Sequence, residues 1–344
     1  MSTNPNQCSG GMAMGNTRRP RFPRMVISRV PLRISFVGGG SDLPGAGSPA
    51  PGLTISTAID QYVYVMAKWR NDGRVIMNWR EKETVALSSE LQHELAREAL
   101  QMLGIHQGIE ISTFADVPGV GSGLGSSAAT TVAIVQAASA LTGIWLGPER
   151  LARAAVEVEL ERLGRKGGSQ DQWISALGGL CRLRHEDGRC VEWTRHGLSP
   201  ANLGLLERHF ALFSPPDHDP GRNADDILDT KDPDDTSFRK CCADLVGQFE
   251  QALTEDDWPS LGNLLGQHDK LKRGTFGGYY PESGPELDKL DVFWKVCGAG
   301  ASGHLLVAVK PETRAQTVQA VEEIWGRELP WSISDEGAQV IHAS

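Results

Sequence analysis

The sequence predicts a mixed fold of β-strands and α-helices, divided into two domains that share a cleft. Its 344 residues are too many for one small hydrophobic core. Segments that alternate apolar and polar residues are typical of strands, and Ala-rich or Pro-initiated segments are typical of helices. We expect the domain boundary near Asn202, before a new apolar segment at residues 210–213. The predicted division is a disordered leader over residues 1–24, a first domain over 25–202 and a second over 203–344.

The first domain is predicted to combine strands with mostly buried helices. Strands are expected over residues 25–37, 53–69, 74–79 and 109–115, and a hairpin over 181–193 turns at Asp187 and Gly188. Helices are expected over residues 89–103, 126–141, 148–163 and 172–177. The helix over 126–141 is rich in Ala and Val on all sides, which is typical of a buried helix.

The second domain is predicted to be mainly helical around a few strands. Strands are expected over 210–213 and 304–309, and helices over 224–228, 237–253, 258–271 and 311–325. A glycine-rich turn over residues 298–303 precedes the second of these strands. This turn is typical of any tight connection before a strand, but it could also cover the candidate phosphate loop of the first domain.

Composition and charge narrow the classes of partner. The net charge is −9, and an acidic surface repels phosphate backbones, so we expect no nucleic-acid partner. No window reaches the ~18 apolar residues of a membrane span, so we expect no membrane partner. None of the six cysteines forms a C-x-x-C pair, which indicates reduced thiols in a cytoplasmic protein.

A loop rich in glycine and serine leads directly into the helix predicted over 126–141. Its glycines let the backbone approach an anion closely, and a helix N-terminus offers unpaired N–H groups and a partial positive charge. A Walker A loop is excluded because no Gly-Lys-Ser/Thr follows, whereas a flexible linker stays an alternative. The candidate nucleotide-binding residues are Pro118, Gly121, Ser122, Gly123, Leu124, Gly125, Ser126 and Ser127.

Two further segments carry candidate acceptor-binding and catalytic groups. A predicted strand delivers Arg33, and the glycine turn after it ends at Asp42, a carboxylate suited to sugar hydroxyls. Asp171 stands in a glycine-bounded turn, where it can act as a base for a hydroxyl. Glu159 precedes it on a helix and can bind Mg²⁺, which prefers oxygen ligands. A capping role for Asp42 or Asp171 and a solvated face for Glu159 remain alternatives.

Four segments in this order resemble the GHMP kinase superfamily: PLRISFVGGGSD, PGVGSGLGSS, GGSQDQW and CGAGASG. The first and third are most similar to the D-glycero-D-manno-heptose 7-phosphate kinase branch. The resemblance implies an α+β fold of two domains, with a ribosomal S5 domain 2-like N-terminal domain and a ferredoxin-like C-terminal domain. The sequence departs from the family pattern at Trp173, Ala301, Ser302 and His304.

The resemblance also implies roles for individual residues and a reaction with ATP and Mg²⁺. Asp171 would take or orient the proton of the accepting hydroxyl beside Arg33, and Ser127 with Glu159 would hold Mg²⁺. Residues implied to bind the sugar or its phosphate are Gly39, Gly40, Ser41, Asp42, Gln170, Arg222, Lys272 and Arg273. For the last three, ordinary surface charge is the alternative.

The implied enzyme phosphorylates the anomeric hydroxyl of a heptose 7-phosphate and gives a 1,7-bisphosphate. We expect a small-molecule partner and a monomer or homodimer. The alternatives are another acceptor, such as a fucose-type sugar, a hexose or an isoprenoid precursor, and a catalytically silent sugar-binding regulator.

Overall fold

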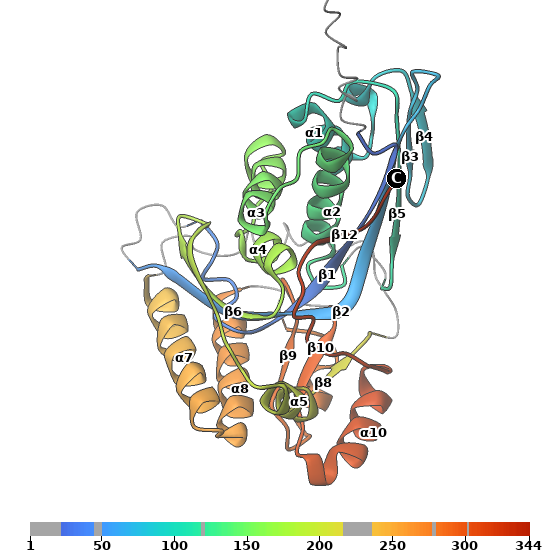
Figure 1. Cartoon of the computed structure of the whole chain (residues 1–344). Helices are drawn as coiled ribbons and strands as arrows, with labels where there is room; N and C mark the ends of the chain where they lie inside the picture. The colour runs from blue at the N-terminus through green and yellow to red at the C-terminus, as the bar shows by residue number, and fades with distance from the viewer. Residues whose placement is uncertain (1–21, 45–49, 118–120, 216–235, 277–279, 301–302) are drawn as a thin grey trace, which may run out of the picture.

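Two long, paired strands run through the first domain (Figure 1). The computed structural model describes residues 22–344 except 45–49, 118–120, 216–235, 277–279 and 301–302. Strand β1 (Met25–Val37) pairs antiparallel with β2 (Gly52–Trp69). Residues 1–21 of the predicted leader, Pro118, Arg222, the helix predicted over 224–228, Ala301 and Ser302 lie outside the described residues.

The sheet of the first domain divides along β2. One half of β2 pairs with β5 and the other half with β6, so the sheet order is β12-β1-β2-β5-β3-β4, with β6 paired to β2 and β7 paired to β6. The remaining strands are β3 (Val75–Asn78), β4 (Lys82–Val85), β5 (Ile109–Ala115), β6 (Leu180–Glu186), β7 (Arg189–Arg195) and β12 (Gln339–Ala343).

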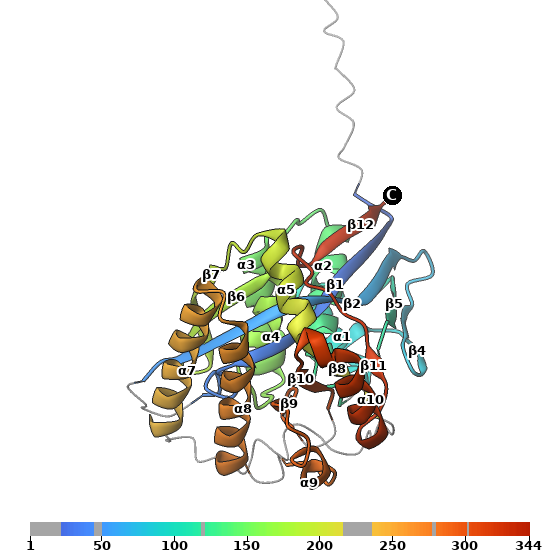
Figure 2. The same cartoon turned by 90° about the horizontal axis from the view of Figure 1, so that it is seen from below.

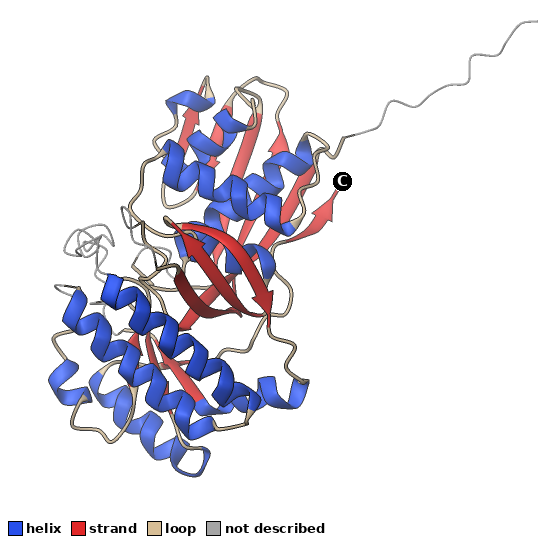
Figure 3. Cartoon of the chain, turned by 90° about the vertical axis from the view of Figure 1, so that its left-hand side faces the viewer, coloured by secondary structure: helices blue, strands red, loops and turns tan. Residues whose placement is uncertain are grey.

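Helices cover one face of this sheet, as Figure 3 shows. They are η1 (Ser88–Glu90), α1 (Glu94–Met102), α2 (Ser126–Leu141), α3 (Pro148–Val156), η2 (Glu157–Arg162) and α4 (Gln170–Leu177). Helix α2 packs on β1 and β2 and is buried along almost its whole length, as its apolar composition predicted. The helix predicted over 148–163 changes at Glu157 into η2, a π-helical segment.

The second domain has a four-stranded antiparallel sheet in the order β11-β8-β10-β9. Its strands are β8 (Phe210–Phe213), β9 (Trp294–Val296), β10 (Leu305–Ala308) and β11 (Glu328–Leu329). Its helices are α5 (Pro200–His209), α7 (Thr236–Thr254), α8 (Trp258–Thr275), α9 (Gly284–Leu287), η3 (Pro311–Thr313) and α10 (Arg314–Ile324). Helices α7 and α8 lie side by side (Figure 2).

The two domains meet at the C-terminal half of β1. From Val30 to Val37 every residue of β1 is buried, because α2 and α4 pack on this strand together with α7 and α8 of the second domain. The boundary predicted near Asn202 falls inside α5. The end of the chain returns to the first domain, where β12 pairs with β1. Residues 339–343 therefore complete the sheet of the first domain. Among the described residues, no helix is both long and apolar enough to cross a membrane.

Candidate active site between the two domains

A cavity of about 1170 Å³ lies where β1, the phosphate-loop candidate, η2 and α4 face α8 and β9. Four segments of the first domain and two of the second therefore contribute to one site. The described candidate residues that line it are Arg33, Gly39, Gly40, Asp42, Gly121, Ser122, Gly123, Gly125, Ser126, Ser127, Glu159, Gln170, Asp171 and Lys272.

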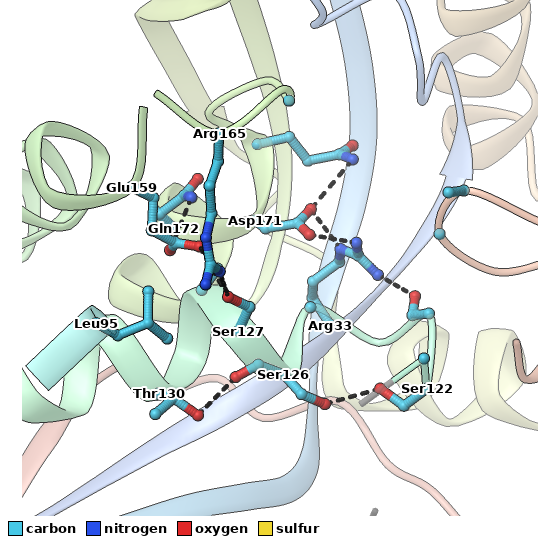
Figure 4. A pocket seen from close by; sticks show the side chains of 18 of the residues that line it. Arg33, Leu95, Ser122, Ser126, Ser127, Thr130, Glu159, Arg165, Asp171 and Gln172 are labelled. Carbon is cyan, nitrogen blue, oxygen red and sulfur yellow. Dashed lines mark hydrogen bonds and ion pairs between the residues drawn. The ribbon is translucent and has the colours of Figure 1, made fainter. Parts of the chain in front are cut away.

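Arg33 and Asp171 form an ion pair near the middle of this cavity (Figure 4). Nε of Arg33 donates to Oδ1 of Asp171 at 2.7 Å, and Nη2 donates to Oδ2 at 2.5 Å. Burial opposes the charge of Arg33, but the adjacent Asp171 carboxylate stabilises it, and the net effect raises the Arg33 pKa. The bidentate geometry holds both carboxylate oxygens in place and leaves the Asp171 side chain partly accessible from the cavity.

The loop before α2 has the form of an anion cradle. Gly125 adopts φ +75°, a left-handed conformation, and α2 starts at the next residue without a side-chain cap. The first N–H groups of a helix have no intrahelical partners and point along its axis, which suits a phosphate. The hydroxyls of Ser122 and Ser126 lie 2.7 Å apart at this end, and Arg33 donates to the carbonyl of Gly123. These features fit a nucleotide polyphosphate.

The second glycine-rich turn supports this loop from the other domain. A Cβ on Gly298 would lie 2.7 Å from Cα of Gly123, and a Cβ on Gly123 would lie 2.4 Å from the carbonyl oxygen of Cys297. The backbone N–H of His304 donates to the carbonyl of Ser122 at 3.0 Å, and its Nδ1 lies 2.7 Å from the same oxygen. His304, which departs from the family pattern, therefore anchors the loop.

Glu159 contacts Ser127 in the first turn of α2, beside the cradle. The Ser127 hydroxyl donates to Oε2 of Glu159 at 2.9 Å, and Gln172 donates to Oε1 at 3.1 Å. Burial raises the pKa of Glu159. A hydroxyl and one carboxylate beside a phosphate cradle are the oxygen donors that Mg²⁺ takes, so these two residues fit the ion. The guanidinium of Arg165 also donates to Ser127, at 2.7 Å (Figure 4).

Asp42 and Gln170 shape the opposite end of the cavity. Asp42 accepts from the N–H of Gly40 at 2.9 Å, which closes the glycine turn after β1. A Cβ on Gly168 would lie 2.1 Å from Oδ2 of Asp42, so only glycine fits beside this carboxylate. The Gln170 amide oxygen accepts from Ser56, and its Nε2 lies 3.4 Å from Oδ1 of Asp171. Asp171 therefore lies between the phosphate-loop end and the Asp42 end of the cavity, in contact with both Arg33 and Gln170.

Three described candidate residues do not line the cavity, and the first of them, Leu124, is fully buried in the hydrophobic core. The Ser41 hydroxyl is fully buried and bonds the backbone of Gly38 and Leu53, so it holds the turn together. Arg273 pairs with Asp269 and Asp288 and stacks over Trp294, and it does not line the cavity. The structure thus brings only the first member of the predicted Lys272–Arg273 pair into the site.

Comparison with known proteins identifies the family. The model of the GHMP kinases N terminal domain matches residues 90–179. Mevalonate kinase of Thermococcus onnurineus is 32% identical over 358 residues, which cover 92% of this chain and 98% of that protein. The chain belongs to the GHMP kinases. D-glycero-alpha-D-manno-heptose 7-phosphate kinase of Campylobacter jejuni is 24% identical over 92% of this chain and 98% of that protein.

Solved structures share the fold of this GHMP kinase over most of the chain. A D-glycero-D-manno-heptose 1-phosphate kinase from Bacteriodes thetaiotaomicron has a TM-score of 0.75 at 22% identity and covers 92% of this chain and 99% of that one. Galactokinase from Lactococcus lactis, complexed with galactose, has a TM-score of 0.69 at 14% identity and covers 92% and 95%. The predicted family and two-domain fold class are confirmed, and the chain is a kinase that phosphorylates an alcohol group.

Sequence reasoning missed several residues that line the cavity of this GHMP kinase. Arg165 stands in the segment GRKGG, where a basic residue between glycines is a usable signal. Lys295 lies inside an apolar strand, and nothing local indicates that it faces a cavity. Trp79, His93 and Phe114 line the end beyond Glu159, and their position depends on how β3, α1 and β5 come together.

Proposed function

We propose that this GHMP kinase transfers the γ-phosphoryl group of ATP to the anomeric hydroxyl of a sugar. We propose a heptose 7-phosphate as the acceptor, which gives a heptose 1,7-bisphosphate. The Arg33–Asp171 pair carries this proposal, because it lies where the phosphate cradle meets the Asp42 end of the cavity. Similarity to the heptose 7-phosphate kinase of Campylobacter jejuni over nearly the full length of both chains supports the choice of sugar.

The N-terminus of α2 binds the nucleotide phosphates in this proposal. Its backbone N–H groups and the Ser126 hydroxyl point at the anion, and Gly123 and Gly125 keep side chains out of the way. Ser127 and Glu159 would hold Mg²⁺, which neutralises charge on the transferring phosphoryl group when it is bound. Arg33 adds a fixed positive charge next to the reacting centre.

Asp171 receives the acceptor hydroxyl. The hydroxyl donates a hydrogen bond to Asp171, and its oxygen forms a bond to the γ-phosphorus while the bond to the β,γ-bridging oxygen breaks. The proton moves to the Asp171 carboxylate, and ADP leaves with the bridging oxygen. Phosphoryl transfer needs positioning and charge neutralisation more than covalent help, and the Arg33 clamp supplies the positioning.

Asp42 and Gln170 bind sugar hydroxyls at the far end. Asp42 keeps Oδ2 beside Gly168, where no side chain competes for the space. Five described cysteines, Cys181, Cys190, Cys241, Cys242 and Cys297, are free thiols, which supports a cytoplasmic enzyme. The proposal includes a monomer or homodimer that acts on small molecules.

A panel of acceptors tests the proposal. The purified protein is incubated with ATP and Mg²⁺ and, in turn, heptose 7-phosphate, heptose, galactose, fucose and mevalonate, and the product is mapped by phosphorus NMR. We expect the strongest turnover with heptose 7-phosphate and a new phosphate at C1. Mevalonate is the second candidate, because a mevalonate kinase is 32% identical over almost the whole chain. Turnover of mevalonate alone would refute the sugar proposal.

A further inference from the structure

Lys295 is a buried cation that projects from the second domain against β1. It stands between Trp294 and Val296 on β9, and because strand side chains alternate, these two neighbours enter the core while Lys295 points to the opposite face. Its ammonium donates to the carbonyl of Ser35 at 2.6 Å and to that of Phe36 at 3.1 Å. Lys295 is only 1% exposed, yet it lines the cavity.

Lys272 reaches the same wall from α8. Its ammonium donates to the carbonyl of Gly298 at 2.7 Å, and the residue is 4% exposed. Gly39, Gly40 and Asp42 line the cavity with the two lysines. Burial and, for Lys295, the neighbouring Lys272 charge lower the pKa values, to about 8 for Lys272 and about 7 for Lys295.

Two ammonium groups in one buried wall are costly for the folded protein. An ion removed from water loses several kcal/mol of solvation, and in the described part of the chain no carboxylate lies within ion-pair distance of Lys295. An apolar side chain of similar length would fill the same volume without this penalty. The arrangement is therefore better explained by an anionic ligand than by stability of the empty protein.

We propose that Lys295 and Lys272 form a binding site for an anionic group, a phosphate, carried by the acceptor itself. This site rests on the proposed function, because the acceptor enters at the wall of Gly39, Gly40 and Asp42. Lys295 lies at the base of that wall, since its partners Ser35 and Phe36 lead directly into the glycine turn. The acceptor is then held at both ends: its phosphate on the lysines, and its reacting hydroxyl on Asp171.

The site makes acceptor binding depend on pH. A dianion raises the pKa of both lysines, so binding takes up protons and weakens as the pH rises through about 7 to 8. The other charged or titratable groups that act on the two lysines are Asp42, Asp269, Arg33, Cys297 and His268. Calorimetry in buffers of different ionisation enthalpy measures this uptake.

Replacement of each lysine by methionine tests the site. We compare kcat/KM for heptose 7-phosphate with kcat/KM for heptose. Loss of one buried charged partner is expected to lower the ratio of the two values by about 100-fold in Lys295→Met and in Lys272→Met. Lys270→Met, an exposed lysine on the same helix α8, is the matched control and keeps the wild-type ratio. An unchanged ratio in Lys295→Met overturns the proposal.

Two further measurements separate the alternatives. The phosphate could instead be the one on the nucleotide, so KM for ATP is measured in the same variants; a rise in KM for ATP with an unchanged acceptor ratio overturns the assignment to the acceptor. If no sugar is phosphorylated at all, the proposed function fails, and the site is tested by itself. Inorganic phosphate is then titrated into the protein saturated with AMPPCP and Mg²⁺. Binding that is lost in Lys295→Met but kept in Lys270→Met supports the site, and binding kept in both refutes it.

Discussion

Arg33 and Lys295 are both buried cations that contact β1, and they are neutralised in different ways. Arg33 lies on the strand itself and has a carboxylate partner, Asp171, that binds it through two hydrogen bonds. Lys295 comes from the other domain and donates to two backbone carbonyls of the same strand. The Arg33 charge is paired with a carboxylate, whereas Lys295 contacts backbone carbonyls and has no carboxylate within ion-pair distance among the described residues.

This difference separates the part of the site that is assembled without substrate from the part whose charge only a bound ligand compensates. Arg33, Asp171, Glu159 and the cradle belong to the first domain and hold one another in place without substrate. The Lys295 side needs an anion before its charge is compensated. A change in the first group should therefore reduce turnover for every acceptor, and a change in the second should affect only phosphorylated acceptors.

The largest effect is expected for Asp171→Asn. Asparagine has nearly the same shape but cannot accept the proton, so turnover should fall by about 10³-fold or more with every acceptor. Binding of a fluorescent ATP analogue should stay within a few-fold of wild type, because Asp171 lies beside the cradle and not in it. Asp187→Asn, in an exposed turn, is the matched control. Full activity of Asp171→Asn would remove Asp171 as the base and would leave room for a purely structural pair.

Glu159→Gln should give the second largest effect. Glutamine can still accept hydrogen bonds from Ser127 and Gln172, but it lacks the charge that attracts Mg²⁺. We expect that about 100-fold more Mg²⁺ is needed for binding of the fluorescent nucleotide, a readout independent of turnover. Glu161→Gln is the control, since Glu161 is exposed on the same η2 segment and pairs with Arg189. Equal Mg²⁺ requirements in the two variants would exclude Glu159 as a metal ligand.

Local patterns predicted most of the fold. The strands over 25–37 and 109–115 and the helix over 126–141 have the predicted bounds, because alternation and apolar composition extend along the whole of each segment. Helix α5 was missed although Ser199 caps it and Pro200 starts it. Strand β12 could not be predicted, since its partner β1 lies some 300 residues away and its own residues are partly exposed.

The candidate site was predictable in the same way: local patterns revealed its local parts, and the contacts between distant segments could not be predicted. The cradle over residues 121–127 is local, so its glycines and serines revealed it. Lys272 and Arg273 are adjacent, and neighbours on a helix point about 100° apart, so only one can face the cavity. The sequence does not tell which, because the choice depends on how α8 docks on β9. The same docking places Lys295 next to Ser35, and no pattern within either segment records it.

Gly298→Ala should have a smaller effect, and it changes a residue that contacts both the lysine site and the phosphate cradle. The carbonyl of Gly298 accepts from Lys272, and its Cα packs on Gly123 of the cradle. A Cβ there would lie 2.7 Å from Gly123, at φ +70°, so the cradle must shift; we expect about tenfold weaker nucleotide binding. Gly274→Ala, with no atom within 4 Å, is the control and should bind normally. Normal binding by Gly298→Ala would show that the second domain does not constrain the cradle.

The smallest expected effect concerns His268 and the pH dependence of the free energy of unfolding. This buried residue of α8 donates from Nε2 to the carbonyl of Gly39 at 3.1 Å. Burial and the charges of Lys295 and Lys272 hold its pKa well below 6.5. The unfolded chain therefore binds a proton at His268 below about pH 6.5 while the folded chain does not, and the free energy of unfolding falls as the pH decreases.

His268→Gln should make this pH dependence shallower, by up to about 1.4 kcal/mol per pH unit below 6.5. Urea unfolding at pH 7, 6 and 5 measures it, and His106→Gln, an exposed histidine, is the control with an unchanged slope. His185, with its pKa lowered by burial to about 4, contributes in the same window and preserves part of the slope in the variant. The two lysines change the stability in a different pH range. Because their pKa values are lowered, the free energy of unfolding decreases as the pH falls from about 10.5 to about 8 for Lys272 and to about 7 for Lys295. A slope unaffected by His268→Gln would mean that the wall around Lys295 accommodates a third positive charge, which would contradict the contrast with Arg33.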